Sequence, residues 1–368
     1  MLKTILYPFS FLYGFVVSIR NLLYDINIWK SKEFDVPVIS VGNITVGGTG
    51  KTPHVEYLIN LLKDQFVVAT LSRGYKRKSK GFYEVEVSSD VSYAGDEPLQ
   101  IKKKFPQTTV AVCENRVIGV QTLLHEKNEI IPDVILLDDG FQHRRITAGI
   151  NILLIDYNRP LKEDMMLPAG RLREGVSQMQ RANVIIFTKC PDEITPIMRR
   201  ILQKDVRLKP YQALFFSKLD YGELNPVFSG RKLNSDFLKR KSQSVLLITG
   251  IAYPKVIVEY IQQFFPETEQ INFPDHHNYT QGDIQQIMNK FNQIDTLEKI
   301  IITTEKDAIR FAALPDLDEE FKKVLYFLPV KVKFLDEEGK MFNKKILNYV
   351  GENKSNRELY KRKNKSQT

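Results

Sequence analysis

The amino-acid sequence predicts an α/β protein with a parallel sheet covered by helices on both faces, and a second, smaller α/β domain. Short apolar segments alternate with amphipathic segments through the first two thirds of the chain, as strands buried on both faces alternate with helices. A shorter series of the same kind follows after residue 212. A glycine-rich segment joins the first strand of the sheet to a helix, where open α/β sheets bind their ligands.

Composition and charge narrow the class of protein. The 368 residues suffice for two domains, and a content of 43% hydrophobic and 26% charged residues excludes global disorder. The net charge of +9 favours an anionic partner, which can be nucleic acid, an acidic membrane surface or a phosphorylated substrate. Cys113 and Cys190, the two cysteines, lie in or beside apolar segments, so we expect free thiols in a reducing cytoplasm.

Residues 1–29 are predicted to form an N-terminal membrane-associated helix. Residues 5–19 are largely apolar, but a span needs about 20 such residues, and Pro8 and Gly14 interrupt them. Basic residues flank the segment, and rings suited to a membrane interface occur at Tyr7, Tyr13, Tyr24 and Trp29. These features favour a helix that lies in the interface, and the alternative is a buried N-terminal helix.

Residues 30–212 are predicted to form the larger domain. Its strands are expected at 36–41, 66–71, 109–112, 134–137, 150–155 and 184–188. Its helices are expected to begin near Lys51, Asp96, Arg116 and Pro191. Alternating residues at 81–87 indicate a hairpin-like insertion.

Residues 213–335 are predicted to form the smaller domain, because a segment rich in turn-forming residues follows position 219. Strands are expected at 245–249, 270–273 and 299–303, and helices at 254–264 and 281–291. The apolar run at 322–335 is interpreted as strands that lead back to the first domain, followed by a return segment at 336–352. Residues 353–368 are polar and strongly basic, which predicts a disordered tail.

The glycine-rich segment 42–53 has the features of a phosphate-binding P-loop, so the larger domain is predicted to be of the P-loop NTPase type. Its glycines let backbone N–H groups turn toward an anion, and the dipole of the following helix adds to the attraction. Lys51 is expected to contact the β- and γ-phosphates, and the Thr52 hydroxyl is expected to bind Mg²⁺. The usual first glycine is replaced by Thr45, which leaves a flexible turn as the alternative. The predicted nucleotide-binding residues are Thr45, Val46, Gly47, Gly48, Thr49, Gly50, Lys51 and Thr52.

Asp138 and Asp139 supply the acidic partner that a P-loop requires. They end the apolar strand at 134–137, at the sheet edge where metal-linked carboxylates of nucleotide-binding proteins lie. We therefore expect both to bind Mg²⁺ and Asp139 to be essential for catalysis. The alternative is a helix cap or a solvated turn.

These motifs together resemble those of the tetraacyldisaccharide 4′-kinases, the lipid A 4′-kinase family. The matching stretches run in the family's order over most of the chain, and a threonine at position 45 is normal in the family. They lie at 41–53 (VGNITVGGTGKTP), 71–77 (LSRGYKR), 94–98 (AGDEP), 114–116 (ENR), 136–145 (LLDDGFQHRR), 167–174 (LPAGRLRE), 273–279 (FPDHHNY) and 303–310 (TTEKDAIR).

The resemblance implies an activity and a location. The family transfers the γ-phosphate of ATP, assisted by Mg²⁺, to the 4′-hydroxyl of a tetraacylated glucosamine disaccharide 1-phosphate. It is attached to the cytoplasmic face of the inner membrane of Gram-negative bacteria. The expected partners are therefore this glycolipid and the membrane surface, which gives the positive charge a role. No nucleic-acid partner is expected, and a monomer is favoured while the oligomeric state stays open.

The resemblance also makes Asp96 a catalytic candidate. A sugar hydroxyl is a poor nucleophile that benefits from a general base, and Asp96 stands in a loop at a predicted helix start, where an N-cap role is the alternative. His276 is expected to orient Asp96 and raise its basicity, with His277 as its rival. This pairing requires the smaller domain to close over the active site of the larger one.

The remaining candidates are assigned less specific roles. Glu174 is expected to bind the metal, and residues 304–307 are assigned to a helix N-terminus. The candidates for binding substrate are Arg73, Arg116, Gln142, His143 and Arg171, of which the arginines suit phosphate oxygens.

Two alternatives to a lipid kinase are kept. The first is another P-loop NTPase, such as a GTPase, or an ATP-dependent ligase acting at the membrane. Thr188 and Lys189 are similar to part of a guanine-recognition motif, but Pro191 stands where that motif needs an aspartate. The second is a membrane-associated nucleotide-binding module without catalysis, which would need neither Asp96 nor His276.

Overall fold

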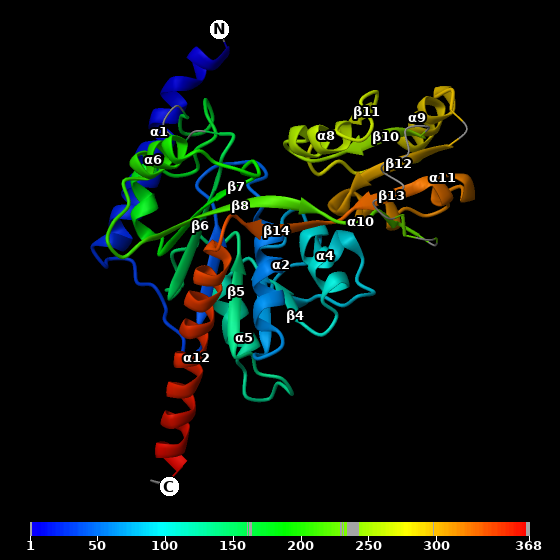
Figure 1. Ribbon diagram of the computed structural model, residues 1–368. Coiled ribbons are helices and arrows are strands. Elements are labelled where there is room, and N and C mark those ends of the chain that lie inside the picture. The colour runs from blue at the N-terminus through cyan, green and yellow to red at the C-terminus, as the bar shows by residue number, and fades with distance from the viewer. Residues whose placement is uncertain are drawn as a thin grey trace.

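A nine-stranded sheet forms the larger part of the molecule in this computed structural model (Figure 1), which describes residues 2–365 apart from 160, 162–163, 229, 231, 234–242 and 297. Its strand order is β14-β8-β7-β6-β1-β5-β2-β4-β3. The seven strands from β8 to β4 are parallel, and β14 and β3 pair antiparallel at the two edges. The strands are β1 (Val38–Gly42), β2 (Val68–Ser72), β3 (Tyr83–Glu84), β4 (Thr109–Val112), β5 (Val134–Asp138), β6 (Ile150–Asp156), β7 (Val184–Thr188), β8 (Ala213–Tyr221) and β14 (Val330–Phe334).

Helices cover both faces of this sheet, as predicted. On one face, α2 (Lys51–Leu62), α4 (Asp96–Lys104) and α12 (Glu338–Lys365) share a core with alternate residues of the strands, for example Ile39 and Val41 of β1. On the other face, α5 (Arg116–Leu123) packs on Val38 and Leu71. Farther along that face lie η1 (Val176–Arg181) and α6 (Pro196–Val206). The two short elements α3 (Val91–Ala94) and β3 lie beside β4 and α4.

A five-stranded sheet of order β11-β10-β12-β13-β9 forms the smaller part. Its helices α9, α10 and α11 share one core and α8 shares another, so this sheet is also covered on two faces. Its elements are β9 (Asn225–Pro226), β10 (Gln243–Thr249), α8 (Lys255–Gln262), β11 (Glu269–Asn272), α9 (Gln281–Gln293), β12 (Glu298–Thr304), α10 (Glu305–Ala312), α11 (Glu319–Val324) and β13 (Leu325–Leu328). We propose that the two sheets define two domains, here called the larger and the smaller domain.

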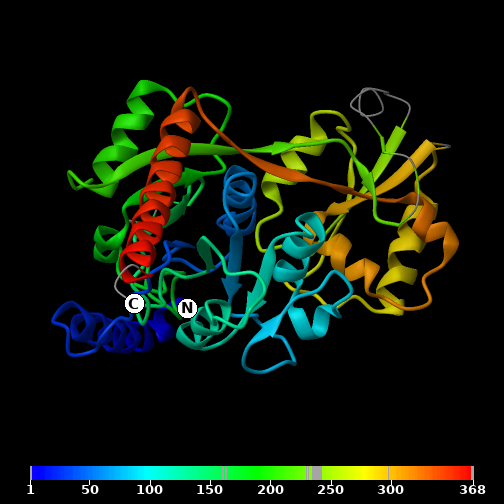
Figure 2. The ribbon, with the colours of Figure 1, turned by 90° about the horizontal axis from the view of Figure 1, so that it is seen from below.

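Two strands join these domains. Figure 2 shows β8 and the chain that enters β14 crossing side by side from one sheet to the other. The expected return of the chain near residue 335 is thus present. The boundary predicted after residue 212 is too early, because β8 pairs with β7 and completes the larger sheet.

Three local predictions differ from the structure. The helix expected near Pro191 begins at Pro196, because the Thr195 side chain caps it by accepting a bond from the Met198 N–H. The segment 81–87 does not form a hairpin of its own, since β3 pairs with β4. The disordered tail predicted at 353–368 is wrong as far as Lys365, because α12 continues as one helix to that residue, and 366–368 lie outside the described residues.

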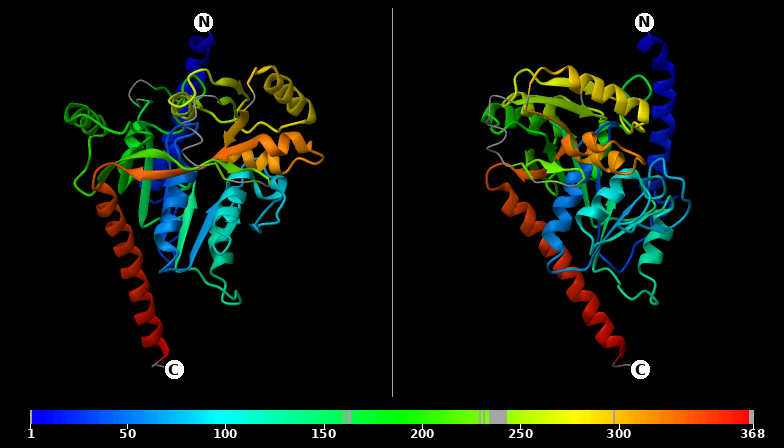
Figure 3. Two further views of the ribbon diagram at one scale, coloured as in Figure 1. Left: turned by 45° about the vertical axis from the view of Figure 1, so that its right-hand side comes forward. Right: turned by 90° about the vertical axis from the view of Figure 1, so that its right-hand side faces the viewer.

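The N-terminal helix α1 (Leu2–Asp25) stands at the edge of the molecule, and Figure 3 shows it projecting away from the sheets at the end opposite to α12. Only 11% of its most apolar part is buried, so the alternative of a buried helix is wrong. Residues Ile5–Asp25 are long and apolar enough to cross a membrane, a criterion that signal sequences also satisfy. The exposed apolar side chains include Ile5, Phe9, Phe11, Leu12, Phe15, Val16, Ile19 and Leu22.

Candidate active site at the P-loop

The P-loop lies between β1 and α2, at the carboxyl edge of the larger sheet. Gly47 and Gly50 have φ angles of 96° and 84°, a backbone conformation that residues other than glycine rarely adopt. The backbone of Thr45 bridges to Leu172, and φ of Thr45 is not positive. A glycine is therefore not required at position 45, which explains in physical terms why the loop keeps its shape without one.

The acidic pair lies beside this loop, as the sequence predicted. Asp139, with φ of 50°, is 3.5 Å from the Lys51 ammonium and accepts two hydrogen bonds from Arg173, at 2.9 and 3.2 Å. Burial would raise the pKa of Asp139, but the charges of Lys51 and Arg173 outweigh burial and lower it. Asp139 is thus an ionised carboxylate, about a third exposed at 36%.

Asp138 has the opposite electrostatic environment. It is 3% exposed, and its Oδ1 atom has no hydrogen-bond partner within the described residues. Burial, together with the charge of Glu97, raises the pKa of Asp138 to about 7. An unpartnered carboxylate oxygen beside a second carboxylate suits Mg²⁺, which takes one or two carboxylates plus phosphate oxygens. Within the described part of the chain, no cluster of three or more His, Cys, Asp or Glu is arranged to hold a metal by itself.

Glu174 does not fit the metal role that the sequence predicted. Its carboxylate is 1% exposed and is paired with Arg20 at 2.8 Å and with Arg181. Asn21 donates a further bond to the same carboxylate. These partners occupy both oxygens, so Glu174 holds α1 against the larger domain through Arg20 instead.

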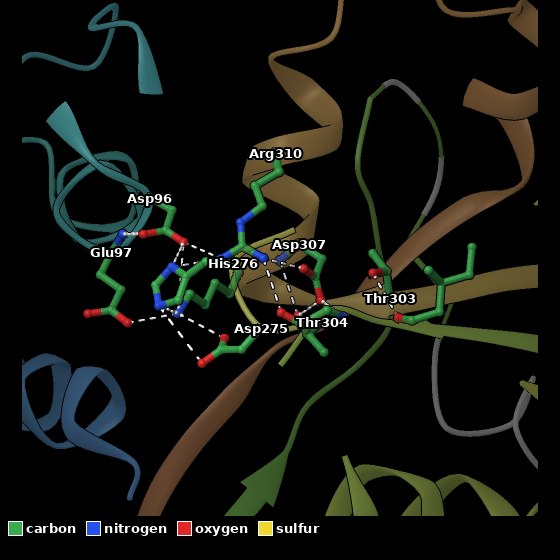
Figure 4. A network of polar contacts seen from close by, with 11 residues as sticks. Asp96, Glu97, Asp275, His276, Thr303, Thr304, Asp307 and Arg310 are labelled. Carbon is green, nitrogen blue, oxygen red and sulfur yellow. Dashed lines mark hydrogen bonds and ion pairs between the residues drawn. The ribbon is translucent and has the colours of Figure 1, made fainter. Parts of the chain in front are cut away.

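Asp96 and His276 meet between the two domains (Figure 4). Asp96 is the first residue of α4, and Gly95 occupies the N-cap position, so the alternative of an N-cap role is wrong. His276 Nδ1 lies 3.1 Å from Asp96 Oδ2, whereas His277 bonds to Asp283 and stacks on Phe273. The structure therefore brings His276, and not its neighbour, to Asp96.

Two cations of α10 complete this contact. Arg310 Nη2 donates to Asp96 Oδ2, and Lys306 Nζ lies 3.8 Å from the same oxygen and 3.2 Å from His276 Nε2. The ammonium only donates, so His276 Nε2 accepts from Lys306, while Nδ1 faces both the Asp96 carboxylate and, at 3.3 Å, Arg310 Nη2. Burial alone would raise the pKa of Asp96, but these donors hold it below its usual range. The expectation that His276 raises the basicity of Asp96 is therefore wrong.

A cavity of about 820 Å³ connects these groups. It is lined by the Lys51, Asp138 and Asp139 cluster and by the Asp96–His276 pair. Of the predicted substrate-binding residues, Arg73, Arg116, Gln142 and His143 also line it. Burial and the surrounding arginines lower the pKa of His143 to about 4, so this imidazole is neutral.

Arg171 is placed differently from the other predicted substrate-binding residues. Its guanidinium bonds to Asp164 at 2.7 Å, and Arg171 does not line the cavity. Its backbone carbonyl instead accepts the Val46 N–H at 2.8 Å, which fixes the start of the P-loop.

Several residues that the sequence did not single out for the site lie in it. Lys306 belongs to the segment 304–307 that was assigned to a helix N-terminus, which it does form, since Thr304 caps α10; Arg310 lies in the last turn of the same helix. A stripe of residues on α1 also lines the cavity. These residues are three or four positions apart, so they share one face of the helix, and this spacing is the sequence signal that could have identified them. The stripe comprises Tyr13, Val17, Arg20 and Tyr24.

A second cavity of about 260 Å³ adjoins the P-loop. The loop residues Gly47–Pro53 form one wall. The opposite walls come from the connecting strands and the smaller domain and include Leu219, Tyr221, Tyr253, Val256 and Val330. Apolar and aromatic walls next to a phosphate loop are suited to a nucleobase.

Comparison with known proteins assigns this chain to a protein family. The family model for tetraacyldisaccharide-1-P 4′-kinase matches residues 2–350. Relatives named tetraacyldisaccharide 4′-kinase include those of Phocaeicola vulgatus, 47% identical over 95% of this chain and 96% of the relative, and Flavobacterium johnsoniae, 43% identical over 96% and 98%. The Aquifex aeolicus LpxK crystal structure, described as an “apo” form in complex with ATP, has a TM-score of 0.71 and 32% identity over 95% of this chain and 99% of that one. The chain therefore belongs to the tetraacyldisaccharide 4′-kinase family.

Proposed function

We propose that this protein transfers the γ-phosphate of ATP to the 4′-hydroxyl of a tetraacylated glucosamine disaccharide 1-phosphate, a step of lipid A biosynthesis. The observation that carries the proposal is that the P-loop lysine, the acidic pair and the Asp96–His276 pair line one cavity. A phosphate donor and a hydroxyl acceptor can thus meet between them. Membership of the 4′-kinase family supports the identity of the acceptor.

The nucleotide is proposed to bind across the P-loop. Backbone N–H groups of residues 47–52 and the α2 dipole attract its phosphates, and Lys51 neutralises charge on the β- and γ-phosphates. The second cavity, with Tyr221 and Tyr253 in its wall, accommodates the base. Since these walls belong to both domains and to the connecting strands, bound ATP favours the arrangement in which both domains line this cavity.

Mg²⁺ is proposed to be held by Thr52, Asp138 and Asp139. The ion would neutralise negative charge that develops on the transferred phosphoryl group. Asp138 supplies the unpartnered oxygen, and Asp139 supplies a carboxylate that Lys51 and Arg173 keep ionised. Because the pKa of Asp138 is raised to about 7, this residue releases a proton when it becomes a metal ligand near neutral pH.

Asp96 is proposed to accept the proton of the attacking 4′-hydroxyl, with His276 orienting it. The low pKa of Asp96 makes it a weak base. Phosphoryl transfer goes through a loose transition state in most analyses, so positioning of the nucleophile matters more than early proton removal. Lys306 and Arg310 keep the carboxylate ionised and fix its direction.

The glycolipid is proposed to approach from α1. The exposed apolar side chains of α1 suit the acyl region of a membrane, and the stripe Tyr13, Val17, Arg20 and Tyr24 of the same helix faces the site cavity. The sugar can therefore reach Asp96 while the acyl chains stay in lipid. The cavity cations Arg73 and Arg116 favour an anionic substrate. We propose that the protein is peripheral, at the cytoplasmic face of the inner membrane of a Gram-negative bacterium.

The direct test measures the products of ATP in the presence of Mg²⁺ and the disaccharide 1-phosphate. The proposal predicts lipid-dependent release of ADP without an equal amount of inorganic phosphate, because the phosphate goes to the lipid. A P-loop NTPase or an ATP-dependent ligase acting at the membrane would release both products together. Lys51→Ala, which removes the charge at the β- and γ-phosphates, should abolish the ADP signal.

A further inference from the structure

Three consecutive carbonyl groups of the P-loop, those of residues 48–50, each accept a hydrogen bond from a side chain. Lys189 Nζ donates to the first. Thr188 Oγ1 donates to the second at 2.9 Å, and His54 Nδ1 lies 2.7 Å from the third. The donors come from the end of β7 and from the first turn of α2. The Gly50 carbonyl also accepts the His54 backbone N–H at 3.3 Å. Side chains thus hold the carbonyls of residues 48 and 49 and add to the helix bond of residue 50.

Two of the three donors are buried and do not line either of the cavities described above. Thr188 is 0% exposed and His54 is 3% exposed. Lys189 lines the smaller cavity and also pairs with Asp156 at 2.9 Å. Thr188 and His54 therefore act on a bound nucleotide only through the loop backbone. Replacing them tests the effect of the loop conformation without removing a direct contact to the nucleotide.

The protonation state of His54 follows from its partners. The Gly50 carbonyl only accepts, so Nδ1 carries the hydrogen and Nε2 accepts from the Ser217 hydroxyl at 3.0 Å. Burial lowers the pKa of His54 to about 4, which keeps the imidazole neutral. Ser217 is 0% exposed and belongs to β8, one of the two strands that join the domains. One buried side chain therefore connects the phosphate loop to the connecting strand.

We propose that Thr188 and His54, together with Lys189, are positioning residues that hold the P-loop carbonyls away from the phosphates, and that Ser217 fixes His54 for this task. At residues 48 and 49 a loop peptide without such a donor can rotate and turn its carbonyl toward the phosphate, where the two oxygens repel. The side-chain bonds remove that conformation from the free protein, so ATP meets a preorganised cradle. At residue 50 the His54 ring strengthens the bond that its own backbone N–H makes. The inference rests on the proposed use of ATP.

The first experiment compares Thr188→Val with Thr188→Ser in the full chain. Valine keeps the volume but removes the hydroxyl, and serine restores it. The dissociation constant of Mg·ATP, measured by calorimetry without lipid, should rise about tenfold in the valine variant, as expected for about 1.4 kcal/mol. The KM for ATP should rise in parallel while kcat and the KM for lipid stay within about twofold. The serine variant should return ATP affinity to the wild-type value.

Thr303→Val is the matched control. Thr303 is also 0% exposed at the end of a parallel strand, and its hydroxyl donates to the Ile248 carbonyl at 3.1 Å. It lies on β12 in the smaller domain, apart from the Asp96–His276 pair (Figure 4). An equal loss of ATP affinity in Thr303→Val and Thr188→Val would overturn the proposal, because any buried hydroxyl would then suffice.

The second experiment separates the two bonds of His54. In His54→Asn the amide NH₂ replaces Nδ1 and keeps the bond to Gly50, whereas in His54→Gln the amide replaces Nε2 and keeps only the reach to Ser217. ATP affinity should stay within about threefold of wild type in the asparagine variant. In the glutamine variant it should fall about tenfold, which corresponds to about 1.4 kcal/mol of binding free energy. If both bind Mg·ATP as wild type does, the proposal is overturned, and this arm decides should Thr188→Val fail to fold. A wild-type protein that does not bind Mg·ATP would contradict the proposed function itself.

Discussion

Arg310 is the residue whose replacement tests the interdomain site most sharply. Its Nη2 atom donates to Asp96, and its Nη1 atom bonds to Asp307 at 2.7 Å and to the Gly250 carbonyl at 3.1 Å. The side chains of Arg310 and Asp96 are 7% and 12% exposed, so solvent screens the pair little. We expect Arg310→Gln to remove the charge at similar length, and Arg310→Lys to keep the charge without the two-pronged geometry.

The size of the effect follows from what remains around Asp96. Breaking one partner of a buried ion pair costs about 3–5 kcal/mol of stability. His276 at 3.1 Å and Lys306 at 3.8 Å still contact the carboxylate. We therefore expect the lower end for Arg310→Gln, about 3 kcal/mol at neutral pH.

The pH dependence has a defined sign. In the native protein the pKa of Asp96 is lowered, so its stabilising contribution is present above the unfolded pKa of about 3.9 and is lost as the pH falls through the folded pKa. Removing Arg310 raises the folded pKa, and each unit takes away about 1.4 kcal/mol of that contribution. The decrease in stability on acidification below about pH 3.9 should therefore be smaller in Arg310→Gln than in wild type.

The assay is thermal unfolding against pH. Arg310→Lys should show an acid-side loss of stability between those of wild type and Arg310→Gln. If Arg310→Gln is folded at neutral pH and loses as much stability on acidification as wild type does, then Arg310 does not set the ionisation of Asp96.

Three further predictions concern the base, the metal site and the membrane. Asp96→Asn should lower kcat by about 10²–10⁴-fold with little change in ATP affinity, and stopped-time assays that show normal turnover would exclude a proton-accepting role. Because the pKa of Asp138 is raised to about 7, Mg²⁺ affinity should fall as the pH drops below 7. Calorimetry in buffers of different ionisation enthalpy should detect the released proton. A Mg²⁺ affinity that does not change between pH 6 and 8 would contradict metal binding by this residue. Phe11 and Phe15 are 79% and 57% exposed, so replacing both by serine should weaken binding to anionic phospholipid vesicles by at least about tenfold, and unchanged sedimentation with vesicles would place the membrane contact elsewhere.

The P-loop and the acidic pair were predictable because each is contiguous in sequence and has a fixed place at the end of a parallel strand. The strands of both sheets were predictable for the same reason, since buried strands are short apolar runs. The Asp96–His276 contact joins residues 180 positions apart, and only the family resemblance indicated it. The local pattern at 303–310 indicates a helix start, but nothing in it indicates that Lys306 and Arg310 reach Asp96.

Other differences have physical causes outside the local sequence. Glu174 lies next to metal-site motifs in sequence, but Arg20 of α1 and Arg181 occupy its oxygens, and such a pairing depends on where a distant helix docks. The segment after residue 352 has few apolar residues to bury, which favoured disorder. It is also rich in lysine and arginine, which are good helix formers, and it continues a helix that Phe342, Ile346 and Val350 anchor in the core.

Mass spectrometry of the lipid after incubation with ATP and Mg²⁺ tests the proposed 4′-kinase activity directly. A 4′-kinase adds one phosphate, which fragmentation locates on the 4′ position of the non-reducing glucosamine, and Lys51→Ala should give no such product. Consumption of ATP with an unmodified lipid, or a phosphate at another hydroxyl, would contradict the proposed activity.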